Sequence, residues 1–67
     1  MSIAKVIEVL AEGETIEAAV QNAVRDASKT VKNIKHAYVQ DIQAEVDDGR
    51  VKKFRVNTKL TFVIKDS

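Results

Sequence analysis

The clearest pattern in the chain is an alternation of apolar and polar residues over Val51–Ile64. Its apolar positions are Phe54, Val56, Leu60, Phe62 and Ile64. From Phe54 onward only Thr58 is polar on that face, and the positions in between are Lys53, Arg55, Asn57, Lys59 and Thr61. A period of two places successive side chains on opposite faces of a strand. The pattern therefore predicts a half-buried antiparallel strand.

A second pattern has apolar residues at steps of three and four and predicts one helix over Thr15–Asn33. Its apolar stripe consists of Ile16, Val20, Ala23, Val24, Ala27, Val31 and Ile34. Thr15 is a residue type that caps helices, Glu17 places a negative charge in the first turn, and Asn33 is a plausible stop. Lys29, Lys32 and Lys35 put positive charge near the predicted end. A helix with one apolar stripe needs a covering surface, and we expect a sheet to provide it.

Two further strands are predicted on either side of the helix. Ile3–Leu10 is rich in β-branched residues and is partly apolar on both faces, so we expect it to be covered on both sides. A turn at Glu12–Glu14 follows it. In His36–Val46 the apolar residues change parity near Gln40–Asp41, which predicts a β-bulge. Asp47–Arg50 carries the Asp-Gly signal of a hairpin.

These elements predict an α+β fold of the order β-α-β-β in a single domain over residues 1–67. The predicted last strand would reach roughly 40 to 45 Å and the predicted helix about 28 Å, so the sheet overhangs the helix. Each large apolar side chain left exposed by the overhang would forfeit about 2 kcal/mol of burial. A chain of 67 residues without cysteine has a marginal core of its own and no disulfide to stabilise it. We therefore expect a homo-oligomer.

Composition excludes several classes of function. The net charge of +1 gives no strong field for nucleic acid, and no apolar run approaches the roughly 20 residues that span a bilayer. Lys5 and Glu8 interrupt the first apolar segment, so no signal peptide is predicted and a cytoplasmic protein is expected. Without cysteine, with one histidine and with no nucleophile-histidine-acid spacing, neither an enzyme nor a metal site is predicted.

Several segments together resemble the dodecins, a family of small flavin-binding proteins. They are Lys5–Glu8, Glu17–Ala23, Ala27–Ile34 and Phe54–Phe62. The resemblance covers nearly the whole chain, although no single short motif in it is diagnostic. It implies a three-stranded antiparallel sheet wrapped around one helix and twelve copies assembled as a hollow homododecamer. It also implies flavins bound in pairs at subunit contacts, stacked between aromatic side chains.

The resemblance points to His36 and Arg55 as cofactor-binding residues. It implies that dodecins that bind flavin well carry a tryptophan at the position of His36 and a glutamine at the position of Arg55. A further arginine of several bacterial members corresponds to Val63 here. Imidazole has a smaller stacking face than indole, and a guanidinium only donates hydrogen bonds, whereas an amide also accepts them. The expected function is flavin binding and storage, with FMN or riboflavin held at subunit interfaces without catalysis. The alternative is a dodecin-like shell that has lost tight flavin binding and serves as a structural, ion-binding or other anionic-ligand-binding assembly.

Nearby residues leave further alternatives open. Lys35 and Lys53 would make the pocket more basic and favour a phosphorylated ligand such as FMN over riboflavin. Tyr38 is expected to pack rather than to contact ligand. The acidic residues at the hairpin, Glu45, Asp47 and Asp48, are expected to serve turn formation, with a divalent cation as the alternative. The basic residues around Phe54 resemble a nucleic-acid stripe, which the low net charge disfavours.

Overall fold

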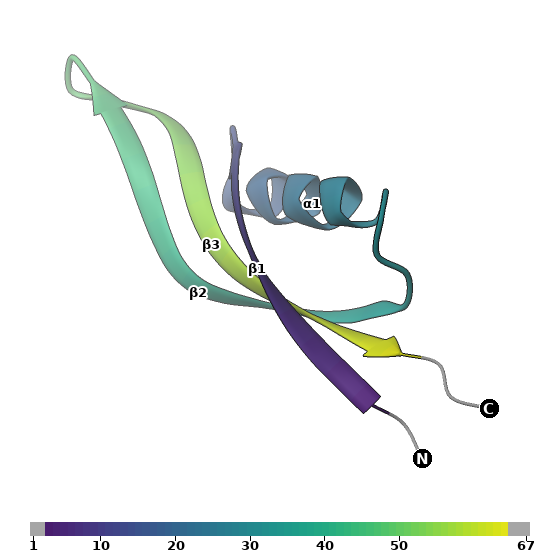
Figure 1. Cartoon of the computed structure of the whole chain (residues 1–67). Helices are drawn as coiled ribbons and strands as arrows, with labels where there is room; N and C mark the ends of the chain where they lie inside the picture. The colour runs from purple at the N-terminus through teal and green to yellow at the C-terminus, as the bar shows by residue number, and fades with distance from the viewer. Residues whose placement is uncertain (1–2, 65–67) are drawn as a thin grey trace.

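A computed structural model describes residues 3–64 of the chain. The elements follow in the order β1 (Ile3–Gly13), α1 (Ile16–Ala27), β2 (Ile34–Asp47) and β3 (Arg50–Ile64). The strands form one antiparallel sheet in the order β1-β3-β2, which curves around α1 (Figure 1). The predicted α+β, β-α-β-β fold is confirmed for these residues. The ends of the predicted domain, residues 1–2 and 65–67, lie outside the described residues.

The strand with the clearest alternation, β3, is the central one and pairs with both neighbours. Val56, Thr58 and Leu60 on its apolar face are fully buried under α1. Thr58, the one polar residue there, donates its hydroxyl to the carbonyl oxygen of Val9 at 3.0 Å. Its burial therefore leaves no unpaired hydroxyl donor.

The start of α1 is the one that the sequence predicts. Thr15 is extended, and its Oγ1 accepts the backbone N–H of Ala18 at 3.0 Å. The buried residues of the helix are all alanine, namely Ala19, Ala23 and Ala27. Because alanine has a short side chain, the helix backbone lies close to the sheet. A Cβ atom added to Gly13 of β1 would lie 2.4 Å from the backbone nitrogen of Ala19.

The predicted end of the helix at Asn33 is wrong, because α1 ends at Ala27. The N–H of Ser28 still donates to the carbonyl oxygen of Val24 at 2.9 Å, but the following residues form a turn. Ser28, Thr30 and Val31 are weak helix formers. Asn33 has a φ of 65°, a left-handed conformation, and stands just before β2.

Residues assigned to the end of the helix consequently have other roles. Ile34 belongs to β2 and faces Phe62 instead of continuing the helical stripe. The basic residue in the last helical turn is Arg25 rather than Lys29, Lys32 or Lys35.

The strands are longer than predicted. β1 continues past Leu10, so Glu12 and Gly13 belong to the strand rather than to a turn. The predicted bulge is confirmed by a register shift between Val39 and Asp41, and two more shifts occur in the β2–β3 pair. The hairpin is also confirmed. Asp48 and Gly49 have φ values of 53° and 75°, as a type I′ turn requires.

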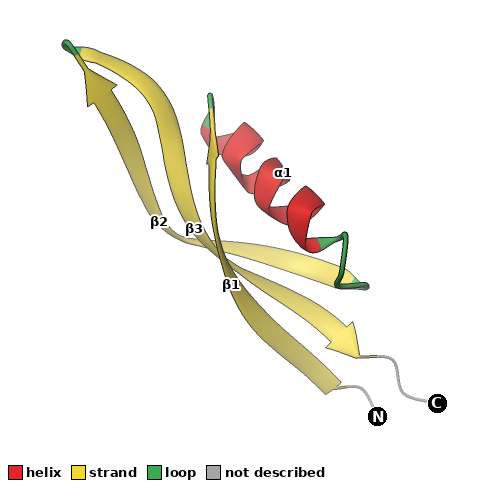
Figure 2. Cartoon of the chain, turned by 45° about the horizontal axis from the view of Figure 1, so that its top comes forward, coloured by secondary structure: helices red, strands yellow, loops and turns green. Residues whose placement is uncertain are grey.

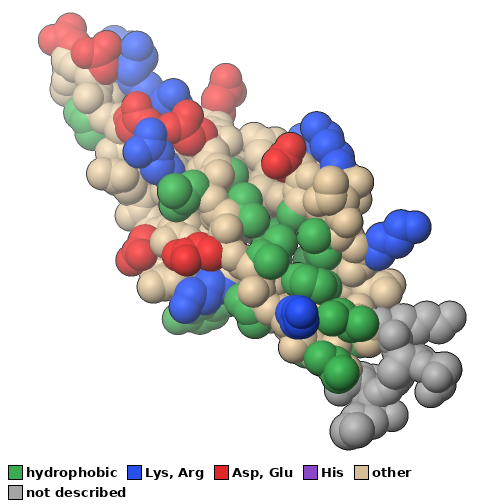
Figure 3. Space-filling model, in the orientation of Figure 1, with side chains coloured by type: hydrophobic (Ala, Val, Ile, Leu, Met, Phe, Trp, Pro, Cys, Tyr) green, Lys and Arg blue, Asp and Glu red, His purple; other side chains and the backbone are tan. Residues whose placement is uncertain are grey.

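The overhang of the sheet is larger than the sequence predicts. With 12 residues α1 spans about 18 Å, whereas the 15 residues of β3 span about 50 Å, and the molecule is 54 Å long. Figure 2 shows the β2–β3 hairpin extending well beyond the helix. The large apolar side chains that remain 39–69 % exposed are Ile3, Val6, Leu10, Tyr38, Ile42, Val46, Val51 and Ile64. Figure 3 shows hydrophobic side chains gathered at the surface toward the chain ends. Among residues 3–64, a single chain thus leaves more large apolar side chains exposed than it fully buries.

Candidate functional site

The candidate site lies on the outer face of the sheet, defined here as the face that points away from α1. Three cross-strand rows of side chains build it. Arg55 of β3 lies between Glu12 of β1 and Gln43 of β2. The next row along β3 is Leu10, Asn57 and Asp41. Further along, Thr61 lies between Val6 and His36. The outer face therefore has a charged end, a mixed centre and an end that carries the histidine.

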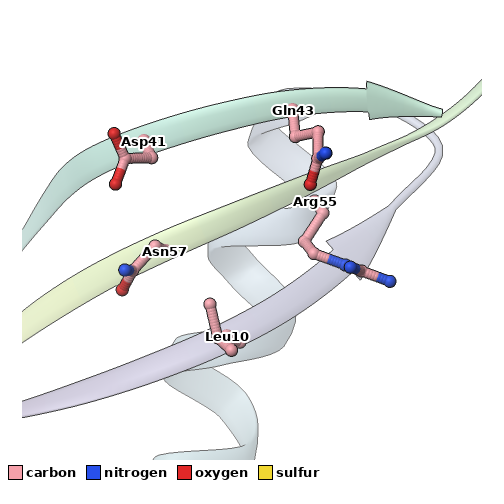
Figure 4. Close-up of a pocket in the computed structure, with 5 residues that line it drawn as sticks. All are labelled: Leu10, Asp41, Gln43, Arg55 and Asn57. Carbon is pink, nitrogen blue, oxygen red and sulfur yellow. The ribbon is translucent and has the colours of Figure 1, made fainter.

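A hollow of about 200 Å³ occupies the mixed centre and is lined by Leu10, Asp41, Gln43, Arg55 and Asn57. We call it the outer-face hollow. Figure 4 shows all five side chains on the side of the sheet opposite the helix, with the guanidinium of Arg55 directed over β1. Next to it, a second hollow of about 450 Å³ is lined by Leu10, Ala11, Glu12 and Arg55. Leu10, which is 69 % exposed, belongs to both hollows. Both are open to solvent in the single chain, so a guest here would be enclosed only by a further copy.

Arg55 belongs to an ion-pair cluster that joins all three strands, which we call the Glu12 cluster. Oε2 of Glu12 accepts hydrogen bonds from Nη2 of Arg55 at 2.7 Å and from its Nε at 3.1 Å. Oε1 of Glu12 lies 3.0 Å from Nζ of Lys53. Nη2 of Arg55 also donates to Oε2 of Glu45 at 3.3 Å. Isolated surface pairs contribute little, but a network of four charges in fixed geometry is a stronger restraint on the sheet.

The cluster changes the acid-base behaviour of its members. The hydrogen bonds from Arg55 and then from Lys53 lower the pKa of Glu12 from its ordinary value of 4.5 to about 2. The same contacts with Glu12 raise the pKa values of Lys53 and Arg55. All three groups are therefore charged over the whole physiological range of pH.

A pH dependence of stability follows from the lowered pKa of Glu12. The folded state binds the Glu12 proton less readily than the unfolded chain, so the stabilisation is fully present above pH 4.5 and is lost as the pH falls to about 2. We expect the urea midpoint of the wild type to fall over this interval more steeply than that of Glu12→Gln. Glu14→Gln, outside the cluster, serves as the control and should keep the wild-type slope. Equal slopes for wild type and Glu12→Gln would contradict the role of the cluster.

The two residues predicted to bind cofactor do not meet within one chain. His36 is exposed and faces Thr61, six residues along β3 from Arg55, which corresponds to about 20 Å. Tyr38, expected to pack, is 66 % exposed and faces Lys59 on the same outer face. A ligand contacting both His36 and Arg55 would therefore have to take them from different copies.

Sequence reasoning missed three residues that the structure places around Arg55. Glu12 was assigned to a turn. Gln43 can be placed only once the register of β2 against β3 is known. Asn57 is detectable in the alternation itself, two positions after Arg55. Among the described residues, its Oδ1 is a buried polar atom with no hydrogen-bond partner.

The structure also shows how the residues of the two alternative sites, a divalent-cation site at the hairpin and a nucleic-acid stripe around Phe54, are arranged. Within residues 3–64, no group of three or more histidine, cysteine, aspartate or glutamate side chains is arranged to hold a metal ion. At the hairpin, Asp47 pairs with Lys52 at 3.2 Å and Glu45 contacts Arg55. The basic stripe around Phe54 consists of Arg50, Lys52, Lys53 and Arg55, and the last three each have a carboxylate partner. This pairing reduces the positive charge that the stripe offers to a phosphate backbone.

The fold and the site define a class: small α+β proteins with one helix on one face of a three-stranded antiparallel sheet and an exposed, partly apolar opposite face. The chain matches the family model Dodecin over residues 3–65 and therefore belongs to the dodecin family. Dodecins are non-catalytic, homo-oligomeric flavin-binding proteins, so membership supports a flavin-binding role at the level of the family.

Solved structures agree with this assignment. The dodecin of Streptomyces coelicolor is 30% identical, with 98% of this chain and 96% of that chain covered and a TM-score of 0.87. A variant of the Thermus thermophilus dodecin is 25% identical over the full length of both chains, with a TM-score of 0.89. The dodecin of Streptomyces davaonensis, 20% identical with 97% of each chain covered and a TM-score of 0.87, shows the same fold. No curated protein matches the chain. In the described part of the chain, no helix is long and apolar enough to cross a membrane.

Proposed function

We propose that the chain assembles as a cytoplasmic hollow homododecamer and stores a flavin, FMN or riboflavin, at contacts between its copies without chemical change to the ligand. The observation that carries this proposal is the open outer-face hollow, which combines the apolar Leu10 with polar side chains of its own row and of the Arg55 row. It lies on the face where Val6, Leu10 and Tyr38 remain exposed. Binding between copies would bury these side chains and the flat ring of the guest together.

The chemistry of the hollow suits the polar edge of a flavin. That edge presents carbonyl acceptors and one N–H donor, and it needs partners that both donate and accept. Arg55 only donates, but Gln43 lies directly opposite on β2 and offers an amide. The carboxylate of Asp41 in the lining adds an acceptor. The amide expected at position 55 is thus replaced, in our proposal, by one at the paired position 43.

Stacking is assigned to His36, with Tyr38 two residues further along the same outer face. Both are exposed, and neighbouring copies would bring the equivalent residues of two chains to one guest. An aromatic pair contributes about 0.5–1.5 kcal/mol beyond its buried area, and imidazole provides less ring surface than indole. We expect weaker binding than a tryptophan at position 36 would give.

The second candidate function is a shell that has lost tight flavin binding and serves a structural, ion-binding or other anionic-ligand-binding role. The observation that favours it is the engagement of Arg55 by Glu12 and Glu45. A side chain held by two carboxylates is costly to redirect toward a ligand. This candidate shares the assembly with the first and differs from it in the ligand.

Titration of flavin fluorescence separates the two functions. We expect wild type to quench riboflavin or FMN, and His36→Trp to bind up to about tenfold more tightly because of its wider stacking face. Gln21→Trp, on the exposed side of α1, is the matched control and should leave the affinity unchanged. If quenching appears only in the double variant His36→Trp/Arg55→Gln, the natural pocket is not a flavin site and the second function holds.

A further inference from the structure

We propose that Glu12 determines the ligand class of the site: by holding Arg55, it makes the outer-face hollow select uncharged ligands that donate hydrogen bonds over anionic ones. The inference rests on the proposed flavin-binding function and names the ligand form that the site prefers. It revises the expectation, drawn from Arg55 and Lys53 alone, that a phosphorylated ligand is favoured.

The guanidinium of Arg55 is already engaged by two carboxylates. Its Nε and Nη2 atoms both donate to the same carboxylate oxygen of Glu12, and Nη2 also reaches Glu45. An arginine recognises a phosphate best when two adjacent N–H groups point at it. Here the edge formed by Nε and Nη2 already faces Glu12. The guanidinium is directed over β1 and away from the centre of the hollow (Figure 4).

The charged side chains around the outer-face hollow sum to a negative charge. Within the Glu12 cluster, two carboxylates balance the cations of Lys53 and Arg55. Asp41 in the lining of the outer-face hollow then adds one negative charge. In the row on the other side of Asn57, Lys59 lies opposite Glu8, and together they add no net charge. A phosphate monoester carries about 1.5 to 2 negative charges at pH 7 and would be repelled by this surrounding.

The lining of the outer-face hollow offers several hydrogen-bond acceptors to a guest. Among the described residues, Oδ1 of Asn57 has no hydrogen-bond partner, but it is already buried in the single chain, and a guest reaches it only if the amide turns. The carboxylate of Asp41 accepts only, and Gln43 adds an amide oxygen. An acceptor of Asp41 or Gln43 that a guest covers without pairing costs about 1–3 kcal/mol, so the site favours a guest that brings N–H or O–H donors. The N–H on the polar edge of a flavin is such a donor in riboflavin and in FMN alike, so the preference between these two ligands rests on the charge of the phosphate.

Glu45 provides a matched control, because Glu12→Gln and Glu45→Gln remove the same charge from the same cluster. Glu12 makes the two shorter bonds to Arg55 and also contacts Lys53, whereas Glu45 makes one contact at 3.3 Å. Glu12→Gln therefore releases Arg55, and Glu45→Gln leaves it held. A difference between the two variants measures the release of the guanidinium and not the change in charge.

The experiment is the ratio of FMN to riboflavin affinity, measured by fluorescence quenching for wild type, Glu12→Gln, Glu45→Gln, Arg55→Gln and Glu12→Gln/Arg55→Gln. We expect wild type to bind riboflavin at least as tightly as FMN. Glu12→Gln should shift the ratio about tenfold toward FMN, and Glu45→Gln less than about threefold. When Arg55 is already replaced by glutamine, Glu12→Gln should shift the ratio of FMN to riboflavin affinity no more than Glu45→Gln shifts it in the wild type.

The outcomes separate this inference from the function on which it rests. Equal shifts for Glu12→Gln and Glu45→Gln, or a wild type that prefers FMN, would overturn the inference while flavin binding stands. If neither flavin is quenched by wild type or by any variant, the proposed function fails and the ligand preference fails with it. Circular dichroism and particle size, recorded for each variant, show whether a lost response reflects a lost fold.

Discussion

A single methyl group added at Gly13 is expected to lower the free energy of unfolding by about 3 kcal/mol, as overpacking at a rigid contact does. The new Cβ of Gly13→Ala would lie 2.4 Å from the backbone nitrogen of Ala19 and 2.8 Å from the carbonyl carbon of Ala18. These atoms belong to the helix backbone and cannot rotate away. The helix would have to move off the sheet and uncover Val56 and Leu60. Urea or thermal unfolding measures the loss.

Two further variants make this prediction specific. Gly13→Ala/Ala19→Gly should not recover stability, because the obstacle is the backbone of Ala19 and not its side chain. Gly49→Ala is the control, since a Cβ there meets nothing within 4 Å. It should cost only about 1 kcal/mol, for the left-handed φ of 75°. If Gly13→Ala is no more destabilising than Gly49→Ala, the close approach of β1 to α1 is not important for stability.

Replacing Leu10 by aspartate is expected to separate the assembly into single chains. Leu10 is 69 % exposed in the single chain and lies at the centre of the face that we propose to be covered by further copies. The substitution forfeits about 2 kcal/mol of apolar burial and places an unpaired carboxylate in the contact. Each contact should weaken roughly a thousandfold or more, for a combined loss of about 4 kcal/mol. Size-exclusion chromatography with light scattering at micromolar concentration reports the change.

The control for this variant introduces the same charge elsewhere. Gln21→Asp lies on the exposed side of α1 and should leave the size of the particle unchanged. Leu10→Ala removes the side chain without adding charge and should weaken the assembly less than Leu10→Asp. A Leu10→Asp protein that keeps the wild-type size and still quenches flavin would show that the outer face is not the contact between copies.

The elements that the sequence predicts well are those whose signals are local. The alternation around Leu60, the Asp-Gly hairpin and the Thr15 cap each act over a few residues. The end of the helix was predicted six residues too late because Val31 and Ile34 continue the spacing of the helical stripe. In the structure Ile34 instead faces Phe62 in the sheet, a contact that no local pattern reveals. Tertiary packing overrides periodicity at this point.

The partners of Arg55 could not be predicted from the sequence, because they depend on register. Counting back from the Asp47–Arg50 pair without a bulge would place Arg55 opposite Ile42. The shift between Glu45 and Val46 moves Gln43 into that place. Arg55 itself was found only through the family resemblance, and its ion pair with Glu12 spans 43 positions of sequence. The residues that line the hollow can therefore be identified only from the register of all three strands.

Sedimentation velocity of the protein with added riboflavin, followed at the visible absorbance of the flavin, tests whether an assembled particle carries the ligand. We expect flavin absorbance to move in one boundary with a particle of about twelve chains of 7.4 kDa, and this boundary to saturate as flavin is added. Flavin that stays behind while a large particle sediments would contradict the storage function. A folded protein sedimenting as a single chain would contradict the assembly on which the whole account depends.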